Sequence, residues 1–155
     1  MIKELINEDS VEINAEVKNW REAVQKSGLI LEKCGKVEHR YTEAMVENVE
    51  HAGPYIVIAP GIAMPHARSE QGVKEIGISL LLLKTPVNFG NPENDPVKIV
   101  VALSAKDSSS HLDTLAELME LLGDKTFVSM ADKPLAKQDL INYIHHKKFS
   151  RSFEI

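Results

Sequence analysis

One histidine of this chain lies in a segment whose composition favours chemistry. His66 belongs to Gly61–Arg68 (GIAMPHAR), and the apolar run Tyr55–Ala59 before it predicts a short strand. A Pro-Gly pair then ends the strand, and Pro65 fixes its own φ and favours an extended residue before it. A neutral imidazole can attack phosphorus, and its ordinary pKa keeps it available at cellular pH. The segment therefore predicts a nucleophile on a rigid connection, with a hydrogen-bonded surface histidine as the alternative.

A second histidine, His111, follows three serines at the start of a predicted helix that has Leu112, Leu115 and Leu122 on one face and is closed by Gly123. If Ser110 is the N-cap, His111 is the first helical residue and Asp113 lies in the first turn. Free N–H groups and the dipole at such a helix start favour phosphate, so Ser110 and His111 are candidate phosphate ligands. A plain capped helix start is the alternative, and it explains the serines by itself.

Two further polar residues could offset the charge of a phosphate. Asn48 falls on the apolar stripe of a predicted helix over 37–51, which also holds Tyr41 and Met45. Its amide could donate to phosphate or make a buried polar contact. Arg68, two residues after His66, could supply positive charge or be solvated. The remaining histidines fit solvated helix positions: His39, His51, His145 and His146.

Hydrophobic periodicity predicts the elements that position these residues. Apolar residues at helical spacing from Ile13 to Leu31 predict a helix with Asn14 as its N-cap. Two strands rich in Leu and Val, buried on both faces, are expected at 76–83 and 97–103. Short helices are expected at 125–131 and from Pro134 onward. This order predicts an α/β fold, a three-layer-like sandwich with a mixed sheet of about four to five strands flanked by helices.

The bulk composition narrows the function classes. The 155 residues fit one domain, 1–155, and a net charge of −5 argues against nucleic-acid binding. No apolar run is long enough to span a bilayer, and the first residues lack the apolar core of a signal peptide. The single Cys34 suits a reducing compartment, so a cytoplasmic location is expected. Nucleotide-binding motifs are not found, and we expect no cofactor and no metal.

The residues from Gly61 to Ala67 resemble the active-site signature of the enzyme IIA components of the bacterial sugar phosphotransferase system, mannitol/fructose class. The flanking Ala59-Pro60 and Arg68 are most similar to the ascorbate- and galactitol-type branch, and the resemblance covers roughly residues 5–147. It implies that His66 accepts phosphate from the phosphocarrier protein HPr and donates it to a IIB cysteine. A membrane IIC component would then import the sugar, with L-ascorbate the expected substrate.

The resemblance also assigns roles within the site. It places the phosphate on Nε2 of His66, although the residues themselves do not select a nitrogen, and it gives His111 the role of orienting the phosphoryl group. In mannitol-type members an arginine lies where this chain has Asn48. A docking surface for the partners is expected from Met64 and its neighbours Ile62 and Pro65.

Two other functions are compatible with these residues. One is a regulatory phosphorelay or sensor module of the same fold that moves no sugar. The other is a metal-dependent hydrolase using His66 and His111, for which the sequence offers no third ligand nearby.

Overall fold

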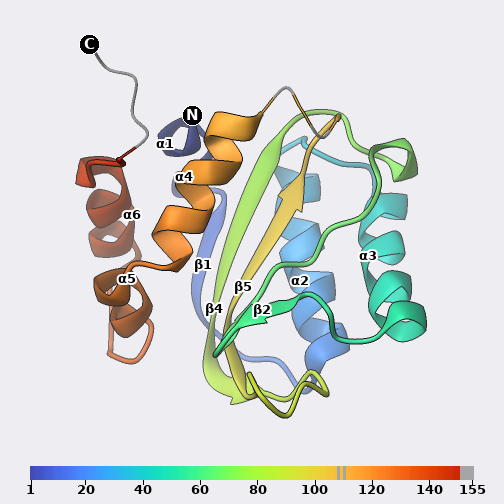
Figure 1. Ribbon diagram of the computed structural model, residues 1–155, viewed down its shortest axis with the longest axis horizontal. Helices are drawn as coiled ribbons and strands as arrows, with labels where there is room; N and C mark the ends of the chain where they lie inside the picture. Colours follow the sequence, from blue (N-terminus) through green and yellow to red (C-terminus); the bar gives the residue numbers. More distant parts are fainter. Residues whose placement is uncertain (108, 110, 151–155) are drawn as a thin grey trace.

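Helices and strands follow one another along the chain, with most of the sheet in its middle third (Figure 1). The structure, a computed structural model, describes residues 1–107, 109 and 111–150. The elements are α1 (Ile2–Leu5), β1 (Val11–Ala15), α2 (Trp20–Lys33), α3 (His39–Ala52), β2 (Val57–Ala59), β3 (Ile62–Ala63), the 3-10 helix η1 (Ser69–Gln71), β4 (Gly77–Val87), β5 (Val97–Ser104), α4 (Leu112–Leu122), α5 (Lys125–Met130) and α6 (Lys137–His146).

The five strands form one mixed sheet in the order β1-β4-β5-β3-β2. The long strands β4 and β5 are antiparallel and occupy the centre. Strand β1 runs parallel to β4, β3 runs parallel to β5, and β2 pairs with β3 as an antiparallel hairpin at the edge. The predicted mixed sheet is therefore confirmed, and its edge hairpin precedes the segment that carries His66.

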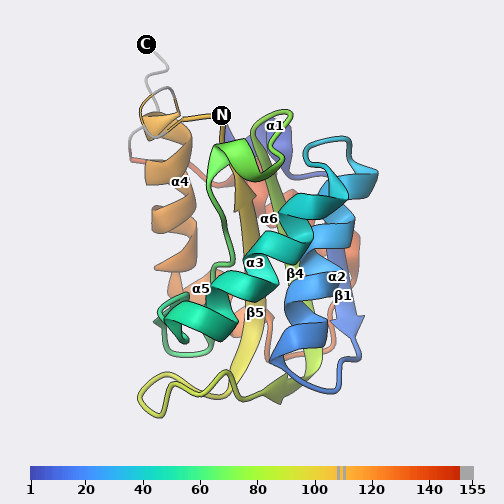
Figure 2. The same cartoon turned by 90° about the vertical axis from the view of Figure 1, so that its right-hand side faces the viewer.

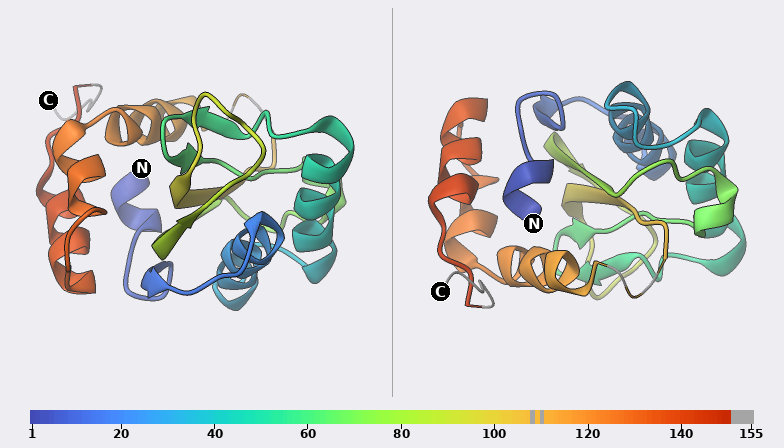
Figure 3. Two further views of the ribbon diagram at one scale, coloured as in Figure 1. Left: turned by 90° about the horizontal axis from the view of Figure 1, so that it is seen from below. Right: turned by 90° about the horizontal axis from the view of Figure 1, so that it is seen from above.

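Helices cover both faces of this sheet, with α2 and α3 on one side and α1, α4, α5 and α6 on the other (Figures 1 and 3). The central strands are buried on both faces, which explains their continuous apolar runs. Leu81 and Leu83 join the cluster beneath α2 and α3, whereas Leu80 and Leu82 join the cluster beneath α4 and α6. The predicted sandwich architecture is confirmed.

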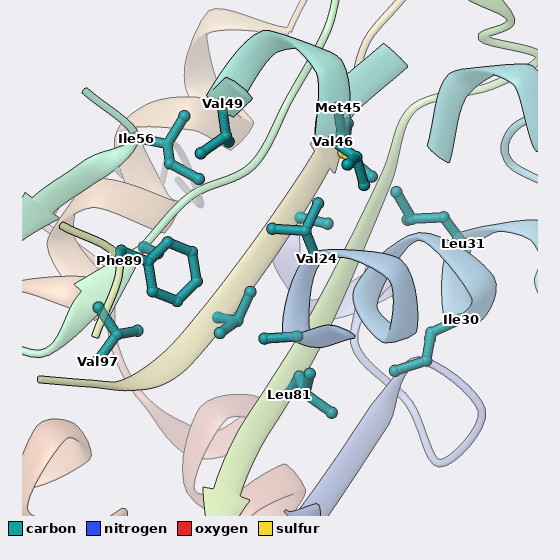
Figure 4. Packing of buried hydrophobic residues seen from close by; sticks show 14 of the residues in the cluster. Val24, Ile30, Leu31, Met45, Val46, Val49, Ile56, Leu81, Phe89 and Val97 are labelled. Carbon is teal, nitrogen blue, oxygen red and sulfur yellow. The ribbon is translucent and has the colours of Figure 1, made fainter. Parts of the chain in front are cut away.

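The cluster beneath α2 and α3 attaches helix α3 to the sheet (Figure 4), and α3 is the helix that contacts the site described below. Val24 and Leu31 of α2 lie with Met45 and Val49 of α3 above Leu81 of β4. All five side chains are at most 5% exposed. Burial of a side chain of this kind stabilises the fold by about 1.5–3 kcal/mol, so α3 is firmly seated on the sheet.

The predicted helix start at Asn14 is wrong. Residues Val11–Ala15 form β1, and Asn14 itself has a positive φ of 55°. Helix α2 begins later, at Trp20, where Oδ1 of the N-cap Asn19 accepts a hydrogen bond from the N–H of Glu22 at 2.9 Å. The helical spacing of Ile13 concealed β1 because its pairing with β4 is a contact between distant segments.

Other boundaries differ by a few residues. Helix α3 begins at His39 and ends before Gly53, close to the prediction. Helix α6 begins at Lys137 rather than near Pro134, because the chain is still extended at Ala136. Such shifts at helix ends leave the layers unchanged.

Candidate functional site

The segment before His66 is a hairpin rather than one strand and a loop. The predicted strand Tyr55–Ala59 is shortened to β2, and β3 follows after a turn in which Gly61 has a φ of 78°, a conformation that suits glycine. The Gly61 N–H donates to the carbonyl of Asn94 at 2.9 Å. The Gly61 carbonyl accepts from the N–H groups of Lys98 and Ile99 at 2.9 and 3.0 Å. The turn is thus fixed to the loop before β5 and to β5 itself.

Backbone hydrogen bonds continue this attachment as far as His66. The N–H of Met64 donates to the carbonyl of Ile56 at 2.8 Å, and the N–H of Leu103 donates to the carbonyl of Pro65 at 3.0 Å. In Figure 2 this part of the chain, in green, runs between α3 and α4. The histidine therefore lies on a short extended segment that is held from both sides.

One ring nitrogen of His66 is already engaged. Its Nδ1 lies 2.9 Å from the backbone carbonyl oxygen of Met64. A carbonyl can only accept, so in the neutral ring Nδ1 carries the hydrogen and Nε2 has the free lone pair. The hydrogen bond thus distinguishes the two ring nitrogens of His66, which the residues alone did not.

The His66 ring is half-buried at the edge of a hollow of about 370 Å³. Tyr55 stands edge-on to the imidazole, with ring centroids 6.0 Å apart and an interplanar angle of 90°. Leu103 at the end of β5 and Leu115 of α4 also line the hollow. The remaining lining residues are Tyr41, Ala67, Arg68, Ser69, Glu70, Ala105 and Asp107.

The guanidinium of Arg68 is turned toward solvent. Its side chain is 79% exposed, and Nε lies 3.2 Å from a carboxylate oxygen of Glu70. An exposed pair of this kind is weak and easily exchanged. Arg68 is the only cationic side chain among the described residues that line the His66 hollow.

Asn48 is half-buried on α3 and faces the backbone of the site. Its Nδ2 donates to the carbonyl oxygen of His66 at 3.3 Å. The structure thus places the Asn48 side chain against the main chain of His66, the predicted nucleophile.

His111 lies at the helix start, one position earlier than predicted. It is the N-cap of α4, and its carbonyl accepts from the N–H of Leu115 at 3.0 Å. Leu115 reaches the His66 hollow, while His111 lines a separate hollow of about 420 Å³ that also includes Met1 and Asp113. The candidate Ser110 lies outside the described residues.

Sequence reasoning missed the role of Tyr41. This side chain is fully buried, and its hydroxyl accepts from the N–H of Ala67 at 3.0 Å and donates to the carbonyl of Leu103 at 2.6 Å. Burial raises the pKa of the Tyr41 hydroxyl to about 12. A tyrosine on an apolar helix stripe was the available signal, because a buried hydroxyl needs a partner.

The expected docking residues are only partly correct. Ile62 and Pro65 are buried, because β3 is an inner strand of the sheet, and Met64 is half-buried. Exposed large apolar side chains are found instead just before and within β2 and on α4. They are Tyr55 at 51%, Ile58 at 41%, Leu112 at 60% and Met119 at 43% exposure.

None of the helices in the described residues is long and apolar enough to cross a membrane. The same residues contain no group of three or more His, Cys, Asp or Glu side chains that could hold a metal ion.

Comparisons with known proteins agree with this architecture. Residues 4–147 match the family model described as "Phosphoenolpyruvate-dependent sugar phosphotransferase system, EIIA 2". The chain is 41% identical over 122 residues to the ascorbate-specific PTS system EIIA components of Escherichia coli (strain K12) and Salmonella typhimurium (strain LT2). Each match covers 78% of this chain and 79% of the relative.

Solved structures show the same fold. The mannitol-specific cryptic phosphotransferase enzyme IIA CmtB from Escherichia coli superposes with a TM-score of 0.82 at 33% identity, covering 95% of this chain and 100% of that chain. The complex of enzyme IIAMTL with phosphorylated enzyme IIBMTL, also from Escherichia coli, gives a TM-score of 0.79 at 20% identity, covering 92% and 98%. The second likeness concerns the fold alone.

The family match spans nearly the whole chain, and the relatives align over more than two thirds of it. The predicted resemblance, drawn from the residues around His66, is therefore confirmed. This chain belongs to the EIIA type 2 family of the phosphoenolpyruvate-dependent sugar phosphotransferase system, and it is a component of that phosphoryl-transfer system.

Proposed function

We propose that His66 carries the phosphoryl group on Nε2. The observation that carries this proposal is the hydrogen bond from Nδ1 to the Met64 carbonyl, which leaves the Nε2 lone pair free. The half-buried ring beside an open hollow is accessible to a partner while its orientation stays fixed. A nucleophile held in one orientation lowers the entropy cost of the transfer.

Two displacement steps at phosphorus follow. The donor is the phosphohistidine of HPr: the Nε2 lone pair bonds to phosphorus, and the donor's P–N electron pair returns to the donor imidazole. The acceptor is a cysteine thiolate of a IIB component, which attacks the same phosphorus while the P–N electron pair returns to Nε2. Neither step needs a nucleotide or a redox cofactor.

The Met64 carbonyl also stabilises the phosphorylated ring. When Nε2 bonds to phosphorus and Nδ1 keeps its hydrogen, the imidazole carries positive charge. The Met64 carbonyl oxygen lies 2.9 Å from Nδ1, at the negative end of the carbonyl dipole. The hydrogen bond from Nδ1–H to this oxygen therefore strengthens as the positive charge develops.

The charge of the phosphoryl group requires donors around the hollow. Arg68 is our candidate for the cationic donor, since only a weak exposed pair with Glu70 holds its side chain. Asn48 has a second amide hydrogen beyond the one that it donates to the His66 carbonyl. His111, the N-cap of α4, and Ser110, which precedes it in the sequence, are the proposed groups that orient the phosphoryl oxygens.

We propose that the exposed apolar side chains around the hollow form the docking face for HPr and IIB in turn. This docking face comprises Tyr55 and Ile58 on the hairpin side and Leu112 and Met119 on α4. Leu115, between the two α4 residues, lines the His66 hollow itself. A small apolar face suits partners that must dissociate quickly. A chain of the same fold has been solved in complex with phosphorylated IIB, so this fold can dock such a partner.

The similarity to ascorbate-specific components supports L-ascorbate as the sugar that the complete system imports. The chain would work in the cytoplasm with a membrane IIC component. Transfer of label from this protein to the cysteine of an ascorbate-type IIB, and not to a mannitol-type IIB, is the expected result. Phosphorylation without transfer to any IIB would favour a regulatory module instead.

The direct test is incubation with phosphoenolpyruvate, enzyme I and HPr, followed by intact mass measurement. We expect one acid-labile phosphate on the unmodified protein and none on His66→Ala. His111→Ala should still be phosphorylated, about 10- to 100-fold more slowly. The exposed His51 on α3 supplies the matched control, and His51→Ala should behave as the unmodified protein. Phosphate retained on His66→Ala would overturn the assignment.

A further inference from the structure

Helix α3 holds both ends of one peptide unit next to His66. The peptide between His66 and Ala67 presents its carbonyl to Nδ2 of Asn48 at 3.3 Å and its N–H to the hydroxyl of Tyr41 at 3.0 Å. Tyr41 and Asn48 are seven residues apart, so they lie two turns apart on one helix face. Two side chains from a single rigid element therefore contact opposite edges of the same planar group.

The Tyr41 hydroxyl extends this contact to the sheet. It donates to the Leu103 carbonyl at 2.6 Å, while the Leu103 N–H donates to the Pro65 carbonyl at 3.0 Å. Strand β5 is thereby tied to the chain on both sides of His66. The Tyr41 side chain is fully buried, and loss of its hydroxyl would leave the Ala67 N–H without this partner.

We propose that Tyr41 and Asn48 are positioning residues for phosphoryl transfer, an inference that rests on His66 being the carrier. The peptides before and after His66 set the direction of its Cα–Cβ bond. With the earlier peptide bonded to β5 and the later one held by α3, the ring reaches the Met64 carbonyl with Nδ1 and presents Nε2 outward. Without these two contacts the chain at His66 could shift relative to β5, which would move Nδ1 away from the Met64 carbonyl and allow the other tautomer.

A purely structural role would have different consequences. It would reduce the amount of folded protein without changing the rate of each folded molecule. A positioning role lowers the maximal rate of transfer and leaves the KM for phosphorylated HPr nearly unchanged, because the docking face is untouched. Loss of a positioning residue should also change the tautomer of the His66 imidazole. This change can be observed in the unphosphorylated protein, without a phosphate donor.

The test compares Tyr41→Phe, Asn48→Ala and the double variant with Tyr143→Phe. Tyr143 is the matched control, since its hydroxyl bonds to Asp124 on the other side of the sheet. We expect each site variant to lower the maximal phosphorylation rate about 10-fold with KM within about twofold. The double variant should be only slightly slower than the slower single variant, because both act on one peptide unit.

Nitrogen-15 NMR of the unphosphorylated proteins gives the independent readout. Wild-type His66 should be the Nδ1–H tautomer, and Tyr41→Phe should show a mixture of both tautomers. Folded variants with wild-type rates and a pure Nδ1–H tautomer would overturn the positioning role. If wild type accepts no phosphate at His66, the proposed function fails, and the tautomer comparison still decides whether the two side chains set the ring.

Discussion

Alkaline pH should destabilise the protein through Tyr41. Burial raises the pKa of this hydroxyl to about 12, whereas a tyrosine in an unfolded chain titrates near its ordinary value of 10. Between these values the unfolded chain loses a proton that the folded protein keeps. The free energy of unfolding therefore falls as the pH rises through this window. The stability contributed by the protonated Tyr41 hydroxyl is fully present below pH 10.

The size of the effect follows from the two pKa values. The difference between them corresponds to a loss of roughly 2–3 kcal/mol in the free energy of unfolding once Tyr41 has lost its proton in both the folded and the unfolded state. About half of this should be lost by pH 11. Tyr41→Phe has no such proton. It should be about 1–3 kcal/mol less stable at neutral pH, because the Ala67 N–H and the Leu103 carbonyl lose their partner.

Urea unfolding followed by far-ultraviolet circular dichroism, at pH 9 and at pH 11, measures this difference. The stability gap between wild type and Tyr41→Phe should narrow by roughly 1–1.5 kcal/mol between the two pH values. Tyr143→Phe is the comparison for a tyrosine whose pKa is raised mainly by a hydrogen bond to Asp124 and not mainly by burial, so its stability gap should change less than that of Tyr41→Phe. A gap that stays constant would refute the buried, hydrogen-bonded hydroxyl on which the positioning argument depends.

Two substitutions and one titration test other parts of the fold. Gly28→Ala would place a methyl group against the Thr42 side chain and, after the better helix propensity of Ala is taken into account, should lower the free energy of unfolding by about 1–2 kcal/mol. In urea unfolding, a Thr42→Ala background should largely remove this penalty. The hydrogen bond to Glu32 raises the pKa of His39 above its ordinary value of 6.5. This hydrogen bond therefore stabilises the fold below pH 6.5, and the stabilisation is lost as the pH rises above that value. An ordinary pKa of His39 in an NMR titration would contradict the pair. Asp95→Ala removes a carboxylate that accepts three consecutive backbone N–H groups at 2.8–2.9 Å and should cost about 1–3 kcal/mol, whereas unchanged stability would show that the loop holds itself.

The parts of the fold that depend on local patterns were predictable. Two-faced burial of β4 and β5 follows from their continuous apolar runs, and Gly53 marks the end of α3. Strand β1 was not predictable in this way, because it is an edge strand whose partner, β4, lies far along the chain. Its apolar residues also happen to fall at helical spacing before α2.

The candidate site shows the same division. The residues around His66 indicated the family through their resemblance to its active-site signature, and Pro65 and Gly61 predicted a constrained backbone there. The contacts of the His66 ring, Tyr41 and Asn48 needed the tertiary structure, since they depend on carbonyl groups of Met64, Leu103 and His66. Backbone acceptors of this kind leave no mark in residue identity.

The most direct test of the account is the position of the phosphate on the ring of His66. Protein labelled with nitrogen-15 at histidine receives phosphate from phosphorylated HPr. Two-bond proton–nitrogen spectra then identify the modified nitrogen. The hydrogen bond from Nδ1 to Met64 predicts phosphate on Nε2, with Nδ1 still bearing hydrogen. Phosphate on Nδ1, or on any residue other than His66, would contradict it.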